Sequence, residues 1–243
     1  MQRHSTLVHA SQPKTMQPTS EPVATKQSGG PSRLRRFTMQ SIVGLSLLGS
    51  LAAGFAWKIG HGAAAVAKEP GQLVAEFAIR DVRTGQLHYR SDHDGRLIAI
   101  VWIGTACPIS QRYLPRLNSL AKNYESRDVD FLAIDSNATE SPTAVAEYAR
   151  RLAIMFPVLT DTENRVADSM AVKQNCEAVL IDRRGRLRYR GAIDDQPAQG
   201  SNQDQPAQKY LAQAIEAVLA NKTVSPETTQ VAGSPIDRAK ATK

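Results

Sequence analysis

The sequence predicts an α/β domain in which one β-sheet carries helices on both faces. Three observations lead to this fold class. An apolar run at Leu97–Ile103 is followed almost at once by a helical pattern over Pro108–Tyr124. Further strand-like and helix-like stretches alternate along the chain. The alternation closes with a hairpin signal and one more amphipathic helix.

The central element is the strand and helix on either side of Cys107. The strand residues are apolar and rich in β-branched side chains, as expected of a buried strand. In the helix that follows, the apolar residues recur on one face. Pro108 suits the first helical position, because its missing N–H costs nothing there.

Cys107 is therefore expected at the N-terminus of a helix. Free backbone N–H groups and the positive end of the helix dipole stabilise a negative charge at this position. They lower the pKa of a thiol and favour the reactive thiolate. A small residue before a helix is in many proteins only a packing choice. Here the order strand, turn, Cys107, Pro108, helix favours a reactive cysteine.

The other elements follow from the same kinds of pattern. A hairpin is predicted where the strand-like stretches 77–82 and 86–89 flank Arg83-Thr84-Gly85. Further strands are predicted at 129–135, 156–159, 178–182 and 187–191, the last two joined by a turn at Gly185. Helices are predicted at 143–152, 164–170 and 207–220.

The net charge of +7 is unevenly distributed. Residues 1–70 carry eight Lys/Arg and two Asp/Glu, whereas residues 71–222 carry nineteen of each. The folded domain therefore lacks the clustered positive charge that nucleic-acid binding requires. The Arg-rich stretch 183–190 alternates as a solvated hairpin does. No nucleic-acid partner is expected.

The N-terminal region predicts export. Residues 1–36 are polar, end in a basic cluster and are predicted to be disordered. The charge-free run 37–57 is long enough to cross a bilayer, and the basic flank before it places the N-terminus in the cytoplasm. Ala65-Val66-Ala67 resembles a signal-peptidase site. The run is therefore either a cleaved signal peptide or a membrane anchor.

These boundaries divide the rest of the chain into three parts. Residues 58–75 are predicted to be a linker, residues 76–221 the folded domain, and residues 222–243 a disordered polar tail. The domain is expected on the extracytoplasmic side of the membrane, where disulfides persist. With two cysteines, the chain has too few for a disulfide scaffold.

The stretch around Cys107 resembles the active-site segment of thioredoxin-like proteins, and specifically of redoxins of the alkyl hydroperoxide reductase/thiol-specific antioxidant family. The matching residues are Trp102 on the strand, Cys107-Pro108-Ile109-Ser110 at the position of C-x-x-C, and Pro115, where this superfamily commonly kinks the helix. The resemblance covers residues 71–221 and implies a thioredoxin-like fold with a central mixed sheet.

The resemblance also implies an activity. It is thiol–disulfide exchange or thiol-dependent peroxide reduction, with Cys107 as the nucleophile and thiol proteins or peroxides as substrates. No organic cofactor and no metal are implied, and an external thiol protein is expected to supply the electrons. Trp102 is expected to form a wall of the site.

The site departs from the family patterns. Ser110 replaces the second cysteine, so this C-x-x-S motif cannot resolve a mixed disulfide by itself. Ser110 lies one helical turn on and is a candidate hydrogen-bond donor to the Cys107 thiolate. The peroxiredoxin pattern of Pro, three residues, Thr or Ser, two residues and Cys is not met, because Ile100 and Gly104 take its first two positions. Thr105 is out of register but is a second candidate donor.

The resemblance suggests a partner for Cys107. Thioredoxin-like proteins carry a cis-proline beside the active cysteine, just before the strand that matches 178–182, and Cys176 takes its position here. A cis bond before a non-proline residue costs ~2.5–4 kcal/mol, so a trans bond is expected. Cys107 and Cys176 are then expected to face each other as attacking and resolving thiols. The alternative is that Cys176 only fills a small apolar gap.

Two other functions stay open. One is a non-catalytic thioredoxin-like module that binds a partner. The other is copper(I) binding, for which two facing thiolates are suitable soft ligands. Nothing in the sequence links His88 or His93 to Cys107. Relatives of this redoxin type end in a segment with a cysteine after a glycine, and the matching Gly233-Ser234 lacks that thiol.

Overall fold

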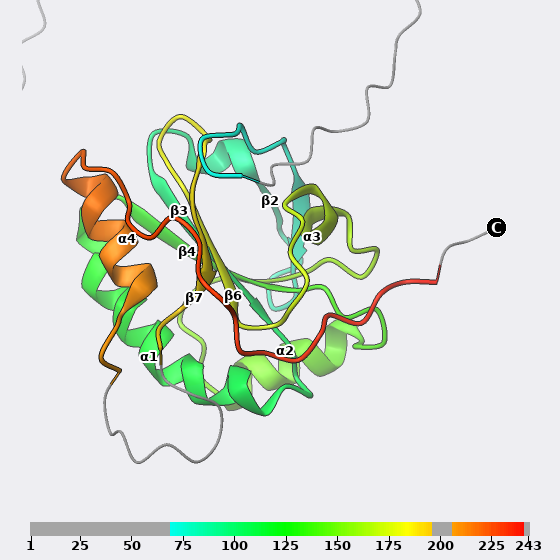
Figure 1. The fold of residues 1–243 in the computed structure, drawn as a ribbon. Coiled ribbons are helices and arrows are strands. Elements are labelled where there is room, and N and C mark those ends of the chain that lie inside the picture. The colour runs from blue at the N-terminus through cyan, green and yellow to red at the C-terminus, as the bar shows by residue number, and fades with distance from the viewer. Residues whose placement is uncertain (1–68, 196–205, 241–243) are drawn as a thin grey trace, which may run out of the picture. The chain divides into compact units, whose positions relative to one another are not determined.

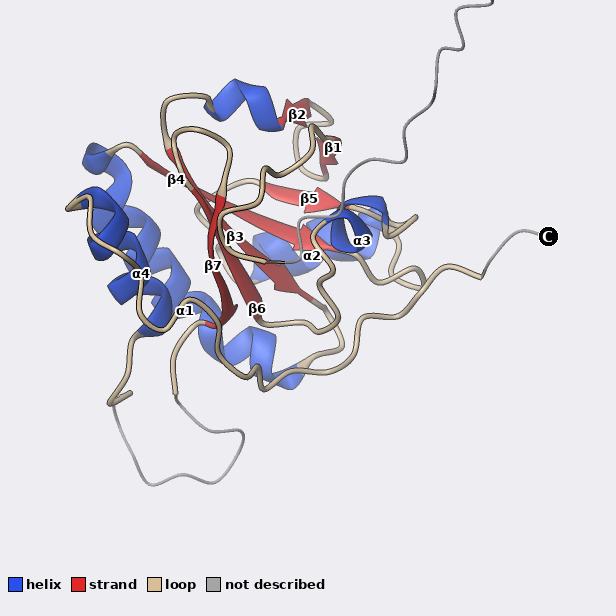
Figure 2. Cartoon of the chain, turned by 45° about the horizontal axis from the view of Figure 1, so that its top comes forward, coloured by secondary structure: helices blue, strands red, loops and turns tan. Residues whose placement is uncertain are grey.

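A seven-stranded mixed sheet forms the centre of the molecule (Figures 1 and 2). The structure is a computed structural model that describes residues 69–195 and 206–240. The strand order is β2-β1-β5-β4-β3-β6-β7. The strands are β1 (Ala78–Asp81), β2 (Leu87–Tyr89), β3 (Leu97–Ile103), β4 (Val129–Asp135), β5 (Val158–Thr160), β6 (Glu177–Ile181) and β7 (Leu187–Ala192).

Strand direction divides the sheet into a parallel centre and antiparallel edges. β3, β4 and β5 run parallel, whereas β6 is antiparallel to both β3 and β7. At the other edge β1 and β2 form the predicted hairpin, and β1 lies antiparallel to β5. The predicted α/β class with a central mixed sheet is confirmed.

β3 is buried on both sides along its whole length. Because side chains alternate along a strand, it contributes to two separate apolar layers. Ala99, Val101 and Ile103 point into one layer, and Ile100 and Trp102 into the other. This explains why the strand reads as an unbroken apolar run rather than as an alternating one.

The two faces of the sheet are covered differently (Figure 2). The layer under Val101 packs against α1 (Pro108–Tyr124), α2 (Pro142–Arg151) and α4 (Tyr210–Leu219). The layer under Trp102 packs against α3 (Arg165–Ser169), residues 74–79 and Ile236. Two short 3₁₀-helices, η1 (Arg90–His93) and η2 (Glu125–Arg127), lie between strands. Helices therefore lie on both faces, as predicted.

Both long helices on the first face begin as their sequences predict. Proline occupies the first turn of α1 and of α2. Ser141 caps α2, since its hydroxyl accepts a hydrogen bond from the N–H of Ala144 at 3.2 Å. Cys107 is the N-cap of α1, and the helix continues through Pro115 to Tyr124.

The C-terminal segment corrects the predicted disordered tail at 222–243. Residues 223–240, which we call the C-terminal strap, run along the domain and are coloured red in Figure 1. Val224 and Ile236 are buried in the two apolar layers. The Thr229 hydroxyl accepts a hydrogen bond from the N–H of Ala192 at 2.8 Å. Two apolar residues so far apart produce no periodic pattern, so this packing could not be predicted from periodicity.

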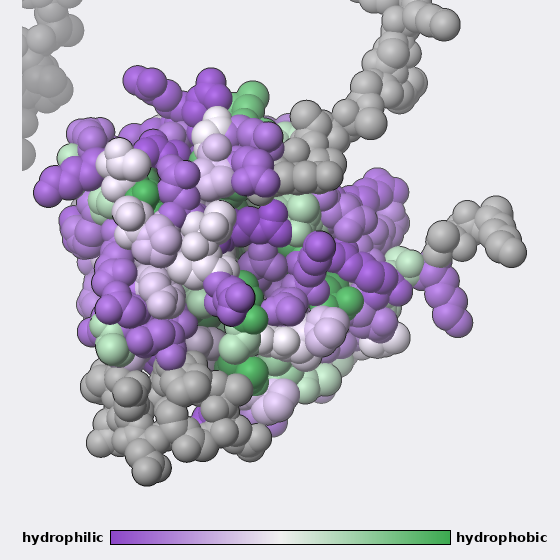
Figure 3. All heavy atoms as spheres, viewed as in Figure 1, coloured by the Kyte–Doolittle hydropathy of each residue, from purple (hydrophilic) through white to green (hydrophobic). Residues whose placement is uncertain are grey.

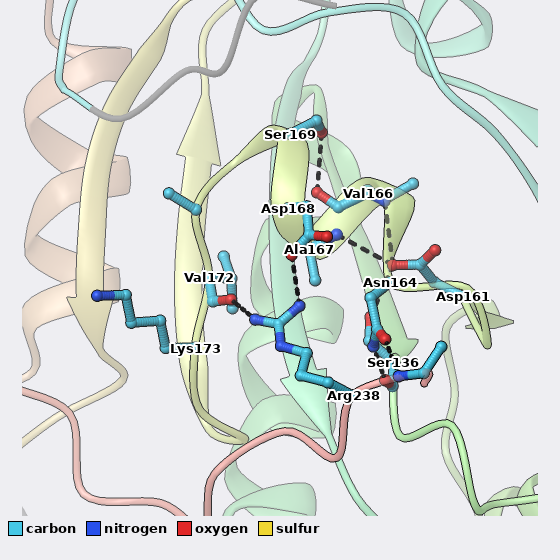
Figure 4. Close-up of polar contacts among 12 residues, drawn as sticks. Ser136, Asp161, Asn164, Val166, Ala167, Asp168, Ser169, Val172, Lys173 and Arg238 are labelled. Atoms are coloured by element: carbon cyan, nitrogen blue, oxygen red, sulfur yellow. Dashed lines mark hydrogen bonds and ion pairs between the residues drawn. The ribbon is translucent and has the colours of Figure 1, made fainter. Parts of the chain in front are cut away.

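The far end of the strap is held by α3 (Figure 4). Arg238 forms an ion pair with Asp168 at 2.6 Å and donates to the carbonyl of Val172. The N–H of Ala239 donates to the side-chain oxygen of Asn164 at 2.7 Å. In the view of Figure 3, the face that the strap crosses is mainly hydrophilic, with hydrophobic residues in small groups. The strap thus buries its few apolar residues and leaves polar ones outside.

The predicted N-terminal features lie largely outside the described residues. These are the polar region 1–36, the apolar run 37–57 and most of the linker 58–75. Among the helices that are described, none combines the length and the apolar character needed to cross a bilayer.

Shortening Ile236 tests whether the strap packs on the core. We expect Ile236→Ala to lower the free energy of unfolding by about 2–3 kcal/mol, because a side chain only 5% exposed leaves a cavity under the sheet. Urea denaturation measures this change. Met155→Ala is the matched control at an exposed position, where the change should stay below about 0.5 kcal/mol. Equal effects of the two substitutions would contradict the packing of the strap.

Candidate active site

Two thiols face each other at the connection between β3 and α1. The sulfur atoms of Cys107 and Cys176 lie 4.0 Å apart, and both cysteines are free. Cys107 stands at the start of α1, and Cys176 immediately precedes β6. Each side chain is only 2% exposed. The structure therefore brings together the pair that the sequence predicts.

The backbone at Cys176 has an unusual conformation. The cis peptide bond among the described residues is Ser225–Pro226, so the bond before Cys176 is trans, as expected. Cys176 has φ = 66°, a left-handed conformation that costs a non-glycine residue of order 1 kcal/mol. Its N–H donates to the carbonyl of Trp102 at 2.7 Å, and the preceding Asn175 N–H donates to Ser234 at 2.8 Å. These two bonds hold the thiol over the end of β3.

The two thiols have pKa values shifted in opposite directions. A hydrogen bond from Cys176 is the largest cause that lowers the pKa of Cys107, which falls to about 4 although burial opposes ionisation. Ser234, through its hydroxyl and its backbone, and the backbone of Ser110 lower that pKa further. The pKa of Cys176 is raised, because its proton is shared with Cys107 and its thiol is buried. At neutral pH, Cys107 is the thiolate and Cys176 the thiol.

The two other predicted site residues lie close by but make different contacts. The Ser110 hydroxyl lies 3.4 Å from the sulfur of Cys176 and accepts from the N–H of Gly104 at 3.2 Å. The Ser110 hydroxyl thus contacts Cys176, whereas the Ser110 backbone lowers the pKa of Cys107. Thr105 donates its N–H to Glu140 at 2.8 Å. Within the described structure, no hydrogen bond joins the Thr105 hydroxyl to Cys107.

Two carboxyl groups border the turn before Cys107. Glu140 accepts hydrogen bonds from the N–H groups of Thr105 at 2.8 Å and of Ala106 at 3.3 Å. Asp135, at the end of β4, pairs with Ile103 in the sheet and shares its face. Burial, followed by the neighbouring Glu140, raises the pKa of Asp135 to about 8. Asp135 therefore holds a proton at neutral pH.

A chain of amides joins these carboxyl groups to the second thiol. Asn137 donates to Asp135 at 3.1 Å and to the side-chain oxygen of Asn175 at 3.2 Å. The two amides close around Gly104, where a Cβ atom would lie 2.9 Å from both side chains. The glycine is therefore required for space, and the network fixes the residue that precedes Cys176.

The histidines considered for copper lie elsewhere. The ring of His93 hydrogen-bonds Asp130 at 2.7 Å and stacks with that of His88, with ring centroids 6.3 Å apart. No group of three or more His, Cys, Asp or Glu side chains in the described part of the chain has metal-site geometry.

Several residues of the site were not predicted from the sequence. Asp135, Asn137 and Glu140 follow the strand beside β3, and this adjacency of strand ends was the available signal. Tyr148 of α2 is also buried, and after burial itself the charges of Cys107 and Cys176 raise its pKa. Ser234 comes from the strap and carried no local signal.

This fold and this site together define a class of protein. A buried thiolate at a helix N-terminus, facing a protonated thiol over the end of a central strand, has the arrangement needed for thiol–disulfide oxidoreduction. The model of the AhpC/TSA family matches residues 70–190. The domain formed by this chain belongs to the AhpC/TSA family.

Relatives from two Geobacillus species are consistent with this class. Thiol-disulfide oxidoreductase ResA of Geobacillus thermodenitrificans is 26% identical over 154 residues, which is 63% of this chain and 86% of the relative. ResA of Geobacillus kaustophilus is 28% identical over 118 residues, 49% of this chain and 66% of the relative. The expectation of a thiol oxidoreductase is confirmed at the level of class.

Solved structures confirm the thioredoxin-like fold. An uncharacterized conserved protein from Geobacillus kaustophilus superposes with a TM-score of 0.65 at 25% identity, covering 72% of this chain and 94% of its own. A protein described as thiol:disulfide interchange protein DsbE from Chlorobium tepidum has a TM-score of 0.53 at 20% identity, covering 63% and 99%.

The ionisation of Cys107 can be followed by thiolate absorbance near 240 nm. In the reduced protein we expect one thiolate to persist as the pH is lowered from 8 and to be lost near pH 4. Cys176→Ala removes the main hydrogen-bond donor and should raise this midpoint by more than about 1 pH unit. Cys107→Ser should remove the signal. A midpoint near 8.5 in the unsubstituted protein, the ordinary thiol value, would contradict the assignment.

The protonated Asp135 predicts a pH-dependent stability difference. A raised native pKa contributes stability at low pH that is lost as the pH rises toward about 8. Asp135→Asn has no proton to lose, so its unfolding free energy relative to the unsubstituted protein should rise by at least about 1 kcal/mol between pH 4 and 8. Urea denaturation at several pH values measures it. Asp128→Asn, at an exposed carboxylate, is the control whose difference should stay flat.

Proposed function

We propose that this chain is an exported thiol–disulfide oxidoreductase in which Cys107 attacks and Cys176 resolves. One observation carries the proposal. Two free thiols lie 4.0 Å apart with their pKa values moved in opposite directions. A pair of this kind has a nucleophile ready at neutral pH and a second thiol placed to attack the first.

The reaction follows from this division of charge. The Cys107 thiolate attacks one sulfur of a substrate disulfide, and the other substrate sulfur leaves as a thiolate. Cys176 then loses its proton and attacks the sulfur of Cys107, which releases the second substrate sulfur. The products are the Cys107–Cys176 disulfide and a substrate with one thiol and one thiolate. An external thiol protein returns two electrons to complete the cycle.

Disulfide exchange fits the site better than peroxide reduction. The Thr105 hydroxyl makes no hydrogen bond to Cys107 in the described structure, and the peroxiredoxin pattern is absent from the sequence. The second thiol stands directly beside the nucleophile. Ser110 contacts Cys176 and is a candidate for steadying the resolving thiol.

The location proposed for the domain is extracytoplasmic. The apolar run 37–57, with basic residues before it, supports attachment to the membrane or cleavage after export. In that compartment a disulfide between Cys107 and Cys176 can persist until a partner reduces it.

Single cysteine substitutions test the two roles. With insulin as the disulfide substrate and dithiothreitol as the reductant, Cys107→Ser should reduce the catalysed rate to the background. When the reduced variant is mixed with insulin in the absence of dithiothreitol, Cys176→Ser should leave a mixed disulfide between Cys107 and insulin, visible as a mass adduct that later addition of dithiothreitol removes. Ser119→Ala, at an exposed position on α1, is the control that should keep full activity.

Three outcomes would contradict the proposal. Full activity in Cys107→Ser would exclude Cys107 as the nucleophile. An inactive but folded unsubstituted protein would instead support the non-catalytic, partner-binding module. Copper(I) binding that requires both thiols, together with inactivity toward disulfides, would support the copper-binding alternative.

A further inference from the structure

The C-terminal strap crosses directly beside the thiol pair. A Cβ atom added to Gly233 would lie 1.7 Å from the carbonyl oxygen of Asn175 and 3.5 Å from the Cβ of Cys176. Pro235 forms an antiparallel bridge with Gln174. Only a glycine allows the strap to approach so closely the turn that carries Cys176.

Asn175 holds Ser234 at this point through two hydrogen bonds. The Ser234 carbonyl accepts the N–H of Asn175 at 2.8 Å, and the Ser234 hydroxyl oxygen accepts from the amide of Asn175 at 3.0 Å. That amide belongs to the network with Asn137. The position of Ser234 is therefore tied to the same residues that fix Cys176.

We propose that Ser234 is a further active-site residue, held by the strap so that its hydroxyl and backbone N–H stabilise the Cys107 thiolate. This inference rests on the proposed function, in which Cys107 is the nucleophile. A Cβ atom on the neighbouring Gly233 would lie 3.5 Å from the Cβ of Cys176, and the sulfur of Cys176 lies 4.0 Å from that of Cys107, so the strap passes beside both thiols. From this position the hydroxyl and the backbone of Ser234 lower the pKa of Cys107. Ser234 lies in the C-terminal segment, beyond the residues 70–190 that the family model matches.

The contacts to Asn175 explain why Ser234 acts as a donor. The hydroxyl oxygen and the carbonyl oxygen both accept hydrogen bonds from Asn175, so the hydroxyl proton and the N–H are left to donate elsewhere. A thiolate is a pure acceptor and suits both donors. The strap thus supplies two donors, in addition to Cys176 and the backbone of Ser110.

The burial of Cys107 places a condition on substrates. Cys107 is only 2% exposed. A substrate sulfur must come within bonding distance of Cys107, so side chains around the thiol must move to admit a substrate.

Thiolate titration of the full chain tests the role of Ser234. Ser234→Ala should raise the midpoint of the absorbance near 240 nm by about 1–2 pH units, the worth of a hydrogen bond to a charged group. Ser234→Thr keeps the hydroxyl and should stay near the unsubstituted value. Thr228→Ala removes an exposed hydroxyl from the same strap and should leave the midpoint unchanged.

A crosslink tests the position of Ser234 independently of its ionisation. In a Cys176→Ser background, Ser234→Cys should form a disulfide with Cys107 when diamide is added. Two thiols lose two hydrogen atoms, diamide takes them up, and the protein mass falls by the mass of those two atoms. Thr228→Cys in the same background is the control that should not crosslink within the molecule.

The two proposals can fail separately. A low midpoint in the unsubstituted protein, with an identical midpoint in Ser234→Ala, would overturn the role of Ser234 and leave the proposed function standing. Failure of the crosslink would overturn the placement of Ser234. A midpoint near the ordinary thiol value in the unsubstituted protein would overturn both, because Cys107 would not be the predicted nucleophile.

Discussion

The contact between the sulfur atoms of Cys107 and Cys176 depends on a single strand. β3 ends in the turn that leads to Cys107, and the carbonyl of its Trp102 holds the N–H of Cys176. Both thiols are thus attached to the same end of the most deeply buried element of the sheet. Because β3 is packed on both faces, the two sulfur atoms are held at a fixed distance.

Burial alone would make both thiols poor nucleophiles, since it disfavours the charged form. The site overcomes this by placing more hydrogen-bond donors around the sulfur of Cys107 than around that of Cys176. The pKa of Cys107 is lowered by a hydrogen bond from the Cys176 thiol, by Ser234 of the strap and by the backbone of Ser110, whereas Cys176 contacts the hydroxyl of Ser110. On the other side of the turn, the Glu140 side chain accepts hydrogen bonds from two backbone N–H groups and lies beside the protonated Asp135.

The C-terminal strap adds to the site a residue, Ser234, that lies outside the part of the chain matched by the family model. It begins after α4, crosses the sheet edge at Arg190, passes the thiol pair and ends on α3 (Figures 1 and 4). Its apolar residues contribute to both core layers, so the strap is joined to the fold as well as to the site. In the proposed cycle, the ionisation of the Cys107 thiol depends in part on Ser234 of this segment.

The sequence by itself determined the parts that depend on local patterns. The apolar run of β3 and Pro108 at the start of α1 are each readable within a few residues and placed Cys107, whereas the position of Cys176 opposite it came from the resemblance to thioredoxin-like proteins. Only the tertiary structure showed Asp135, Glu140 and Ser234 beside them. The hydrogen bonds of Glu140 to Thr105 and of Ser234 to Asn175 join residues 35 and 59 positions apart, and neither periodicity nor spacing encodes which strand ends meet or where a polar strap returns to the sheet.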